Sequence, residues 1–172
     1  MVKRMKPVVA PAGKTQPTFW GVGPSIGSLT AIHFAVVFII DRLTTPAFQI
    51  ASLSQPAAII LGLSLITLGI ALYLFTLRAL MRARSENQLI TTGPYRLVRH
   101  PLYTIALFLL CPGFCVMFRS WLVLSTIAAQ AVAVWLFLGR EEQALLETFG
   151  EDYEDYKRKT PAVIPFMKPA RD

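Results

Sequence analysis

Four long stretches without any charged residue restrict what this chain can fold into. A bilayer-spanning helix needs roughly 20 mostly apolar residues, and each stretch supplies that length or nearly so. The stretches are Thr15–Ile40, Leu43–Leu77, Pro101–Phe118 and Ser120–Gly139. We therefore predict an all-α integral membrane protein with four transmembrane helices, at approximately Val22–Ile40, Ala57–Leu77, Leu102–Phe118 and Trp121–Leu138.

Two of the predicted connections are informative. Only Arg119 and Ser120 separate the last two charge-free stretches, and so short a link predicts an antiparallel helical hairpin. The segment "LTTPAFQIASLSQP" (43–56) opens the second stretch and contains several polar and proline breaks, so we interpret it as an interfacial loop.

The basic residues predict how the chain is oriented. Lysines and arginines concentrate on the cytoplasmic flanks of membrane helices. The N-terminal tail holds four of them, the connection between the second and third spans five, and the C-terminal segment six, whereas the other two connections hold only Arg42 and Arg119. Both termini are therefore expected in the cytoplasm, of a bacterial inner membrane or of the endoplasmic reticulum. Topology also accounts for the net charge of +7, so no nucleic-acid partner is expected.

Residues 1–20 are expected to form a flexible tail, and residues 21–172 a single membrane domain. The tail contains "PVVAPAGKTQPTFWG", whose prolines interrupt any continuous apolar core of a secretory signal. Cys111 and Cys115 lie four residues apart without a nearby histidine, so we interpret them as small apolar residues of a helix and predict no metal site.

Hydrogen-bonding side chains gather in two separate segments. The first is "NQLITTGPYRLVRHPLY" (87–103), where Pro101 suits the first turn of a helix and places His100 at a helix N-terminus. The second, "GREEQALLETFGEDYEDYKRKTPAVIP" (139–165), continues with helical spacing from the fourth span and has a break available at Gly150. The predicted hairpin brings both segments to the same membrane surface, so one site is expected from two distant parts of the chain, with a cytoplasmic helical segment after the fourth span.

These two segments resemble the isoprenylcysteine carboxyl methyltransferase family and its relatives among the phospholipid N-methyltransferases. The shared pattern is G-x-Y, then R-H-P-x-Y, a hairpin of two spans, E-E, then F-G-x-x-Y-x-x-Y and a proline, and the resemblance covers roughly residues 57–167. Members of this family are integral membrane enzymes that use S-adenosylmethionine.

The resemblance implies which residues bind the cofactor. The positions that match the family's pocket are Asn87, Gln88, Leu89, Ile90, Tyr95, His100, Pro101, Leu102, Tyr103, Glu141 and Glu142. The chain departs from the eukaryotic prenylcysteine enzymes at Phe137, where they carry an arginine on the substrate side. Arg99 and Arg140 are the nearest groups that could serve an acceptor in its place, and they are the candidate catalytic residues.

The expected function is methyl transfer from S-adenosylmethionine to a small lipophilic or lipid-linked acceptor that enters from the membrane lipids. A polar cluster at the mouth of an apolar segment suits an enzyme whose two substrates come from water and from lipid. Two alternatives remain open: an NADPH-dependent membrane reductase of the sterol-reductase kind, and a non-enzymatic membrane transporter or assembly factor.

Overall fold

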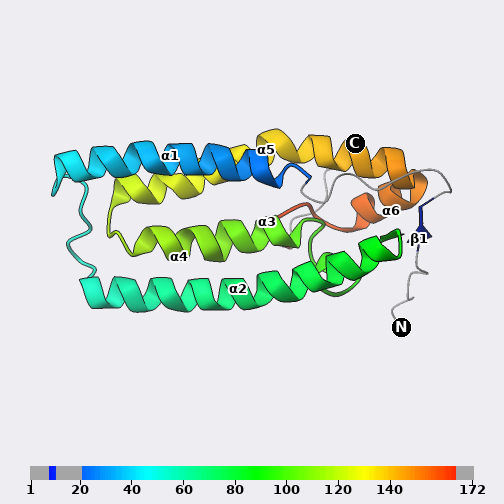
Figure 1. Ribbon diagram of the computed structural model, residues 1–172, viewed down its shortest axis with the longest axis horizontal. Helices are drawn as coiled ribbons and strands as arrows, with labels where there is room; N and C mark the ends of the chain where they lie inside the picture. Colours follow the sequence, from blue (N-terminus) through cyan, green and yellow to red (C-terminus); the bar gives the residue numbers. More distant parts are fainter. Residues whose placement is uncertain (1–7, 11–20, 166–172) are drawn as a thin grey trace. The chain divides into compact units, whose positions relative to one another are not determined.

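The described part of the chain, residues 8–10 and 21–165 of a computed structural model, is mostly helical (Figure 1). The long helices are α1 (Gly23–Thr44), α2 (Gln55–Ser85) and α5 (Trp121–Phe149), and α6 (Glu151–Lys159) follows α5. Between α2 and α5 lie a 3₁₀ turn, η1 (Gly93–Arg96), and a continuous helical run made of α3 (Pro101–Ile105), the π-helical turn η2 (Ala106–Leu110) and α4 (Cys111–Val116). The all-helical membrane class expected from the sequence is confirmed.

Among the described residues, three helices are long and apolar enough to cross a membrane: α1, α2 and α5. The run from Pro101 to Val116 is also apolar but shorter. The helices extend beyond the predicted spans, because α2 continues to Ser85 and α5 to Phe149. The additional turns of both helices contain charged residues, so they do not lengthen the apolar segments that could cross a membrane.

The chain forms two compact units, each assembled from distant segments. Residues 22–72 and 105–138 make up one unit, called here the apolar unit. Of the described residues, 8–10, 21, 73–104 and 139–165 make up the other, called here the polar unit, which contains both polar segments noted in the sequence.

Glycines allow close helix packing in the apolar unit. A Cβ atom added to Gly62 of α2 would lie 2.5 Å from the carbonyl oxygen of Gly113, and one added to Gly113 of α4 would lie 2.9 Å from the Cβ of Leu65. Small residues that let two backbones approach are typical of helix contacts in membranes. Phe34 and Phe38 of α1 contribute to the same unit by packing on the rings of Phe114 and Phe118.

A tight hairpin joins α4 to α5, as the sequence predicts. The turn at Met117–Ser120 contains Arg119 at a φ of +53°. The hydroxyl of Ser120 donates a 2.5 Å hydrogen bond to the carboxylate of Asp41, and both residues are buried. The predicted interfacial loop follows α1 and pairs back on this turn through a bridge between Gln49 and Ser120.

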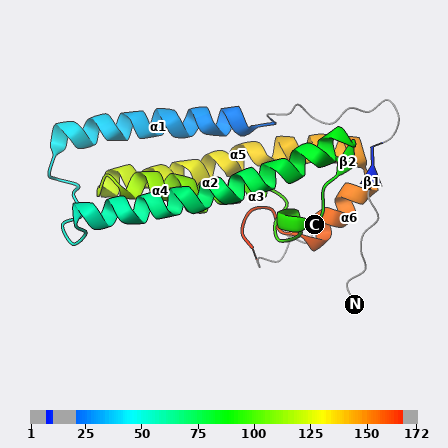
Figure 2. The same cartoon turned by 60° about the horizontal axis from the view of Figure 1, so that its bottom comes forward.

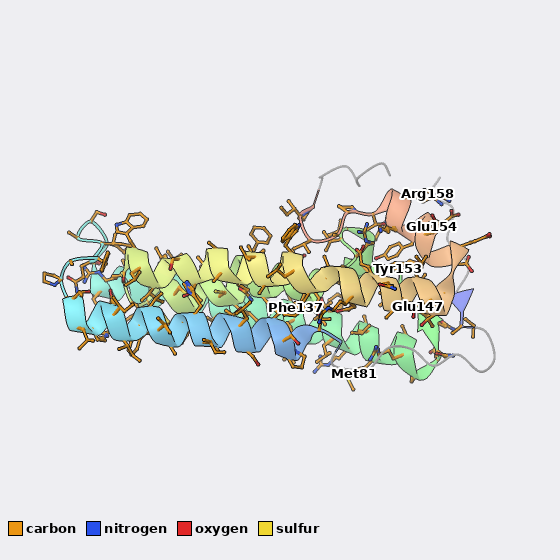
Figure 3. All side chains as sticks on the ribbon, turned by 90° about the horizontal axis from the view of Figure 1, so that it is seen from above. Met81, Phe137, Glu147, Tyr153, Glu154 and Arg158 are labelled. Carbon is orange, nitrogen blue, oxygen red and sulfur yellow. The ribbon has the colours of Figure 1, made fainter. Side chains whose placement is uncertain are left out.

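In the polar unit, α5 continues as one helix through Glu141 and Glu142 and ends where Gly150 was expected to break it. Gly150 has a φ of +56°, a conformation that glycine adopts without steric cost. The turn folds α6 back so that Tyr153 lies between α6 and α5, while Glu154 and Arg158 point outward (Figure 3).

A short two-stranded sheet was not expected from the sequence. Strand β1 (Val8–Val9) pairs antiparallel with β2 (Gln88–Leu89), and Figure 2 shows the two strands beside each other. Ala10 follows β1 and is buried in a cluster with Leu89, Phe149, Tyr153 and Tyr156. The prediction of a flexible tail over residues 1–20 is thus corrected for residues 8–10, because backbone pairing and this apolar cluster hold them; the other residues of the tail lie outside the described part.

Candidate functional site

Two carboxylates of α5 face the residues that open α3. The apolar part of α5 ends at Leu138, and Glu141 and Glu142 lie in the polar turn beyond it. The hydroxyl of Tyr103 donates a 2.6 Å hydrogen bond to Oε2 of Glu141. His100 lies between the acids, with Nδ1 at 3.8 Å from Oε1 of Glu141 and Nε2 at 3.3 Å from Oε1 of Glu142. Each ring nitrogen of this histidine therefore faces a different carboxylate.

Arg99 holds Glu142 and the end of α6 together. Its Nε and Nη2 donate hydrogen bonds of 2.9 and 2.5 Å to Oε1 of Glu142. Its Nη1 donates to the carbonyl oxygens of Lys157 at 3.0 Å and Thr160 at 2.5 Å. The Arg99 side chain is only 7% exposed and that of Glu142 13%. Because all three guanidinium nitrogens are used within the protein, Arg99 is a structural anchor of the site.

The two acids differ in how they are compensated. Glu142 has three cationic or titratable neighbours, since the Nζ of Lys157 lies 3.5 Å from its Oε2 in addition to Arg99 and His100. Glu141 is paired with the neutral hydroxyl of Tyr103, and its side chain is more exposed, at 22%. Glu141 is consequently the carboxylate with the greater capacity to accept hydrogen bonds from a bound molecule.

The segment after α6 fixes the backbone of the R-H-P motif. The amide of Arg99 donates to the carbonyl of Pro161 at 2.8 Å, and the amide of His100 donates to the carbonyl of Ala162 at 3.0 Å. The hydroxyl of Thr104 adds a 2.7 Å bond to the carbonyl of Val163. These bonds tie the two residues that precede α3, and the first turn of α3, to the segment that follows α6.

Buried tyrosines connect the two segments a second time. The Tyr156 hydroxyl donates a 2.5 Å hydrogen bond to the carbonyl oxygen of Tyr95, and both side chains are buried. Burial raises the pKa of Tyr156 and of Tyr95 above the usual range, so both phenols remain neutral at physiological pH. The ring of Tyr103 stacks on that of His100, with centroids 5.8 Å apart and an interplanar angle of 20°.

The remaining predicted site residues occupy several different positions in the fold. Asn87 has a φ of +51° and its carbonyl accepts a 2.9 Å bond from the amide of Ala10, while Gln88 and Leu89 form β2. Ile90 follows this strand, Pro101 is the first residue of α3, and Leu102 is half-buried beside it. Arg140 lies on an exposed face of α5, so the two candidate arginines occupy different environments.

Sequence reasoning missed several residues that contact the site. Lys157 and the carbonyls of residues 157–163 were not expected there, and neither was Gly21, where a Cβ atom would lie 2.9 Å from Oε2 of Glu141. A pocket of about 190 Å³ also opens beside Glu142, between α5 and α6. Its lining consists of Gly139, Glu142, Gln143, Leu146, Tyr153 and Lys157. The sequence shows a glycine directly before the first predicted span, but nothing in it indicates a contact with Glu141.

In chemical terms, the site offers a half-buried acid, a buried histidine and aromatic surfaces at the end of an apolar helix. Among residues 8–10 and 21–165 no group of three or more His, Cys, Asp or Glu side chains is placed to hold a metal ion. This combination suits binding of a polar organic molecule with cationic and hydroxyl groups.

Comparison with known families identifies the family of this chain. The family model described as phospholipid methyltransferase matches residues 57–152, more than half of the chain. The chain belongs to the phospholipid methyltransferase family. The matched range contains His100, Tyr103, Glu141 and Glu142, and the relationship expected from the sequence motifs is confirmed.

The similar curated proteins are named either as metal-resistance proteins or as protein-S-isoprenylcysteine O-methyltransferases. The cobalt-zinc-cadmium resistance protein CzcN of Cupriavidus metallidurans is 34% identical over 108 residues, which cover 61% of this chain and 46% of that protein. A probable protein-S-isoprenylcysteine O-methyltransferase of Oryza sativa subsp. indica is 37% identical over 87 residues, 48% of this chain and 44% of that protein. The chain thus spans about half the length of the curated relatives it matches.

A solved structure shares the fold. The structure of the eukaryotic intramembrane Ras methyltransferase ICMT superimposes with a TM-score of 0.59 at 24% sequence identity, covering 86% of this chain and 55% of the other. At this identity the likeness concerns the fold.

Proposed function

We propose that this protein is an integral membrane methyltransferase that uses S-adenosylmethionine and acts on a small lipophilic or lipid-linked acceptor. One observation carries the proposal: His100 and Tyr103 from one segment contact Glu141 and Glu142 from a distant one. All four residues lie within the range that the methyltransferase family model matches. The names of the isoprenylcysteine relatives support the same reaction class.

The residues present fit this cofactor. Glu141 keeps acceptor capacity for an ammonium group or ribose hydroxyls, because within residues 8–10 and 21–165 the hydroxyl of Tyr103 is its one short hydrogen-bond partner and its side chain is only partly buried. His100 faces both glutamates through its two ring nitrogens, so its role in this proposal is to orient the two carboxylates toward the cofactor. When bound, S-adenosylmethionine supplies an electrophilic methyl group, and the chain supplies binding and orientation.

Arg99 takes a positioning role in this proposal. Its guanidinium is occupied by Glu142 and by two backbone carbonyls, so its contribution is to hold Glu142 and the end of α6 in place. Arg140, on the exposed face of α5, is the arginine proposed to reach an acceptor or a lipid headgroup.

The membrane arrangement is part of the proposal. We propose that the run from Pro101 to Val116 crosses the bilayer with α1, α2 and α5, giving four spans and cytoplasmic termini. The 15 basic residues on the predicted cytoplasmic side, against Arg42 and Arg119 on the other, support this arrangement. Reporter fusions after Arg42 and Arg119 should report an external location, and fusions after Arg84 and Asp172 an internal one. A cytoplasmic signal after Arg119 would contradict the hairpin.

Binding of radiolabelled S-adenosylmethionine to the purified protein in detergent tests the function. Glu141→Gln and His100→Ala remove partners of a partly desolvated site, which typically costs about 2–5 kcal/mol. Each should weaken binding by well over tenfold. Glu151→Gln, a change to an exposed acid of α6, serves as the control and should leave affinity unchanged. Unchanged affinity in both site variants would reject this site.

The same preparation separates the alternatives. A reductase of the sterol-reductase kind would bind NADPH in preference to S-adenosylmethionine, and a transporter or assembly factor would bind neither. Saturable binding of S-adenosylmethionine followed by methylation of a lipophilic amine or carboxylate identifies the methyltransferase.

A further inference from the structure

The N-terminal segment touches the candidate site at two separated points. At one point, the backbone of Val8–Val9 pairs with Gln88–Leu89, and the amide of Ala10 donates a 2.9 Å hydrogen bond to the carbonyl of Asn87. At the other, Gly21 lies directly against the carboxylate of Glu141. All of these residues belong to the polar unit.

Gly21 occupies a position where an added side chain would meet the carboxylate of Glu141. Its φ is +49°, a region in which side chains are strained. A Cβ atom there would lie 2.9 Å from Oε2 and 3.2 Å from Cδ of Glu141. Oε2 is also the atom that accepts the hydrogen bond from Tyr103. Because a distance under 3.0 Å forces one group to move, a side chain at residue 21 would displace the carboxylate from Tyr103.

Ala10 marks the second point with a small buried side chain. It is 7% exposed and packs in the cluster of Leu89, Phe149, Tyr153 and Tyr156. Leu89 is one of the residues that the family resemblance assigns to the cofactor pocket. The preceding residue, Val9, is 57% exposed, so the two neighbours on this segment face opposite environments.

We propose that Gly21 and the segment Val8–Ala10 are positioning elements of the cofactor site: Gly21 sets the place of the Glu141 carboxylate, and Val8–Ala10 sets the place of Asn87–Leu89. The inference rests on the proposed function, because its consequence is measured as affinity for S-adenosylmethionine. It assigns a role to a part of the chain that lies outside the range matched by the family model, residues 57–152.

Gly21→Ala is the first test, measured by equilibrium binding of S-adenosylmethionine to the full chain in detergent. We expect about tenfold weaker binding, since Glu141 loses a hydrogen bond of the charged type. Gly150→Ala is the matched control for backbone strain, because Gly150 has a φ of +56° but no atom within 4 Å of its added Cβ. This control should lower the thermal midpoint to a similar degree and leave affinity within twofold.

The effect must also depend on the carboxylate at residue 141. In a Glu141→Gln background, the additional change Gly21→Ala should weaken binding by less than threefold, because the group that Gly21 positions has already been altered. A full tenfold effect in that background, or equal affinity of Gly21→Ala and the unchanged protein, would overturn the role of Gly21.

Ala10→Glu and Val9→Glu form a matched pair for the second point. Each places the same charge on the same segment, but only Ala10 is buried. Ala10→Glu should raise the KM for S-adenosylmethionine at least fivefold with little change in kcat, and Val9→Glu should change neither. Equal effects of the two changes would reject the role of this segment. If the unchanged protein binds no S-adenosylmethionine, the proposed function itself fails, whereas normal binding with no response to either set of variants rejects only this inference.

Discussion

Replacing Arg99 by methionine gives the most direct measure of what stabilises the site. Methionine keeps an unbranched apolar side chain but removes the bonds to Glu142 and to the carbonyls of Lys157 and Thr160. Both side chains of the ion pair are almost fully buried, so solvent screening is small. Breaking a buried pair by removing one partner typically costs about 3–5 kcal/mol, because the buried charge that stays behind loses compensation. Glu142 would keep only His100 and the half-exposed Lys157 as neighbours of this kind among the described residues.

This cost is large enough to measure as a thermal shift. For a chain of 150–250 residues, each kcal/mol lowers the midpoint by roughly 2–4 °C. Arg99→Met should therefore lower the apparent midpoint in detergent by about 6–20 °C. Arg96→Met removes an exposed arginine of the same segment and should shift the midpoint by less than about 2 °C.

A double variant separates the loss of the pair from the loss of packing. Glu142→Gln combined with Arg99→Met removes the uncompensated charge, and replacing both partners of a buried pair is often close to neutral. The double variant should be more stable than Arg99→Met alone. If it is less stable, or if Arg99→Met behaves like Arg96→Met, the assignment of Arg99 as the anchor of Glu142 is refuted.

Three further results are expected. Tyr156→Phe leaves the buried carbonyl of Tyr95 without its 2.5 Å donor and should cost about 1–3 kcal/mol, measured as a lower thermal midpoint. Gly62→Ala and Gly113→Ala place a methyl group against a neighbouring helix and should cost about 1–3 kcal/mol each, whereas Gly27→Ala, which has no atom within 4 Å of the added Cβ, should cost nothing measurable. Phe137→Arg should increase methylation of a prenylcysteine carboxylate relative to a neutral or amine-bearing lipophile, because it places a cation where the family resemblance implies an arginine; efficient turnover of the carboxylate by the unchanged protein would contradict this reasoning.

The sequence predicted the helices because the bilayer imposes a simple requirement on length and polarity. The hairpin at Arg119 and Ser120, the break at Gly150 and the start of α3 at Pro101 all follow from local residue preferences, and the structure has each of them. The π-helical turn at Ala106–Leu110 was not predicted, because nothing in that apolar segment distinguishes one helical hydrogen-bond pattern from another.

The site was predictable in composition but not in pairing. The approach of His100 and Tyr103 to the two glutamates follows from the hairpin and the family motifs. Which side chain bonds to which acid was not predictable. Arg99 bonds to Glu142 and Tyr103 to Glu141, and these partners lie 43 and 38 residues apart in the chain, so the pairing depends on side-chain directions in the folded protein. The strand at Val8–Val9 depends on backbone pairing with Gln88–Leu89, and Ala10 after it is buried in a cluster with Tyr153. A tail rich in proline and polar residues gives no local sign of these tertiary contacts.

The backbone bonds between the R-H-P motif and the segment after α6 also bear on the order of synthesis. Arg99 and His100 leave the ribosome about sixty residues before Pro161 and Ala162, the residues whose carbonyls accept their amide hydrogen bonds. During that interval α4 and α5 are synthesised, and Arg99 gains its partners one after another: Glu142 follows it by 43 residues, and Lys157 and Thr160 follow it by 58 and 61. Until the last partner emerges, water and lipid headgroups must solvate the arginine, so this part of the chain has to stay at the membrane surface while the hairpin inserts. Helix insertion therefore precedes assembly of the site, and a chain arrested before residue 160 would contain its apolar helices but not the completed polar cluster.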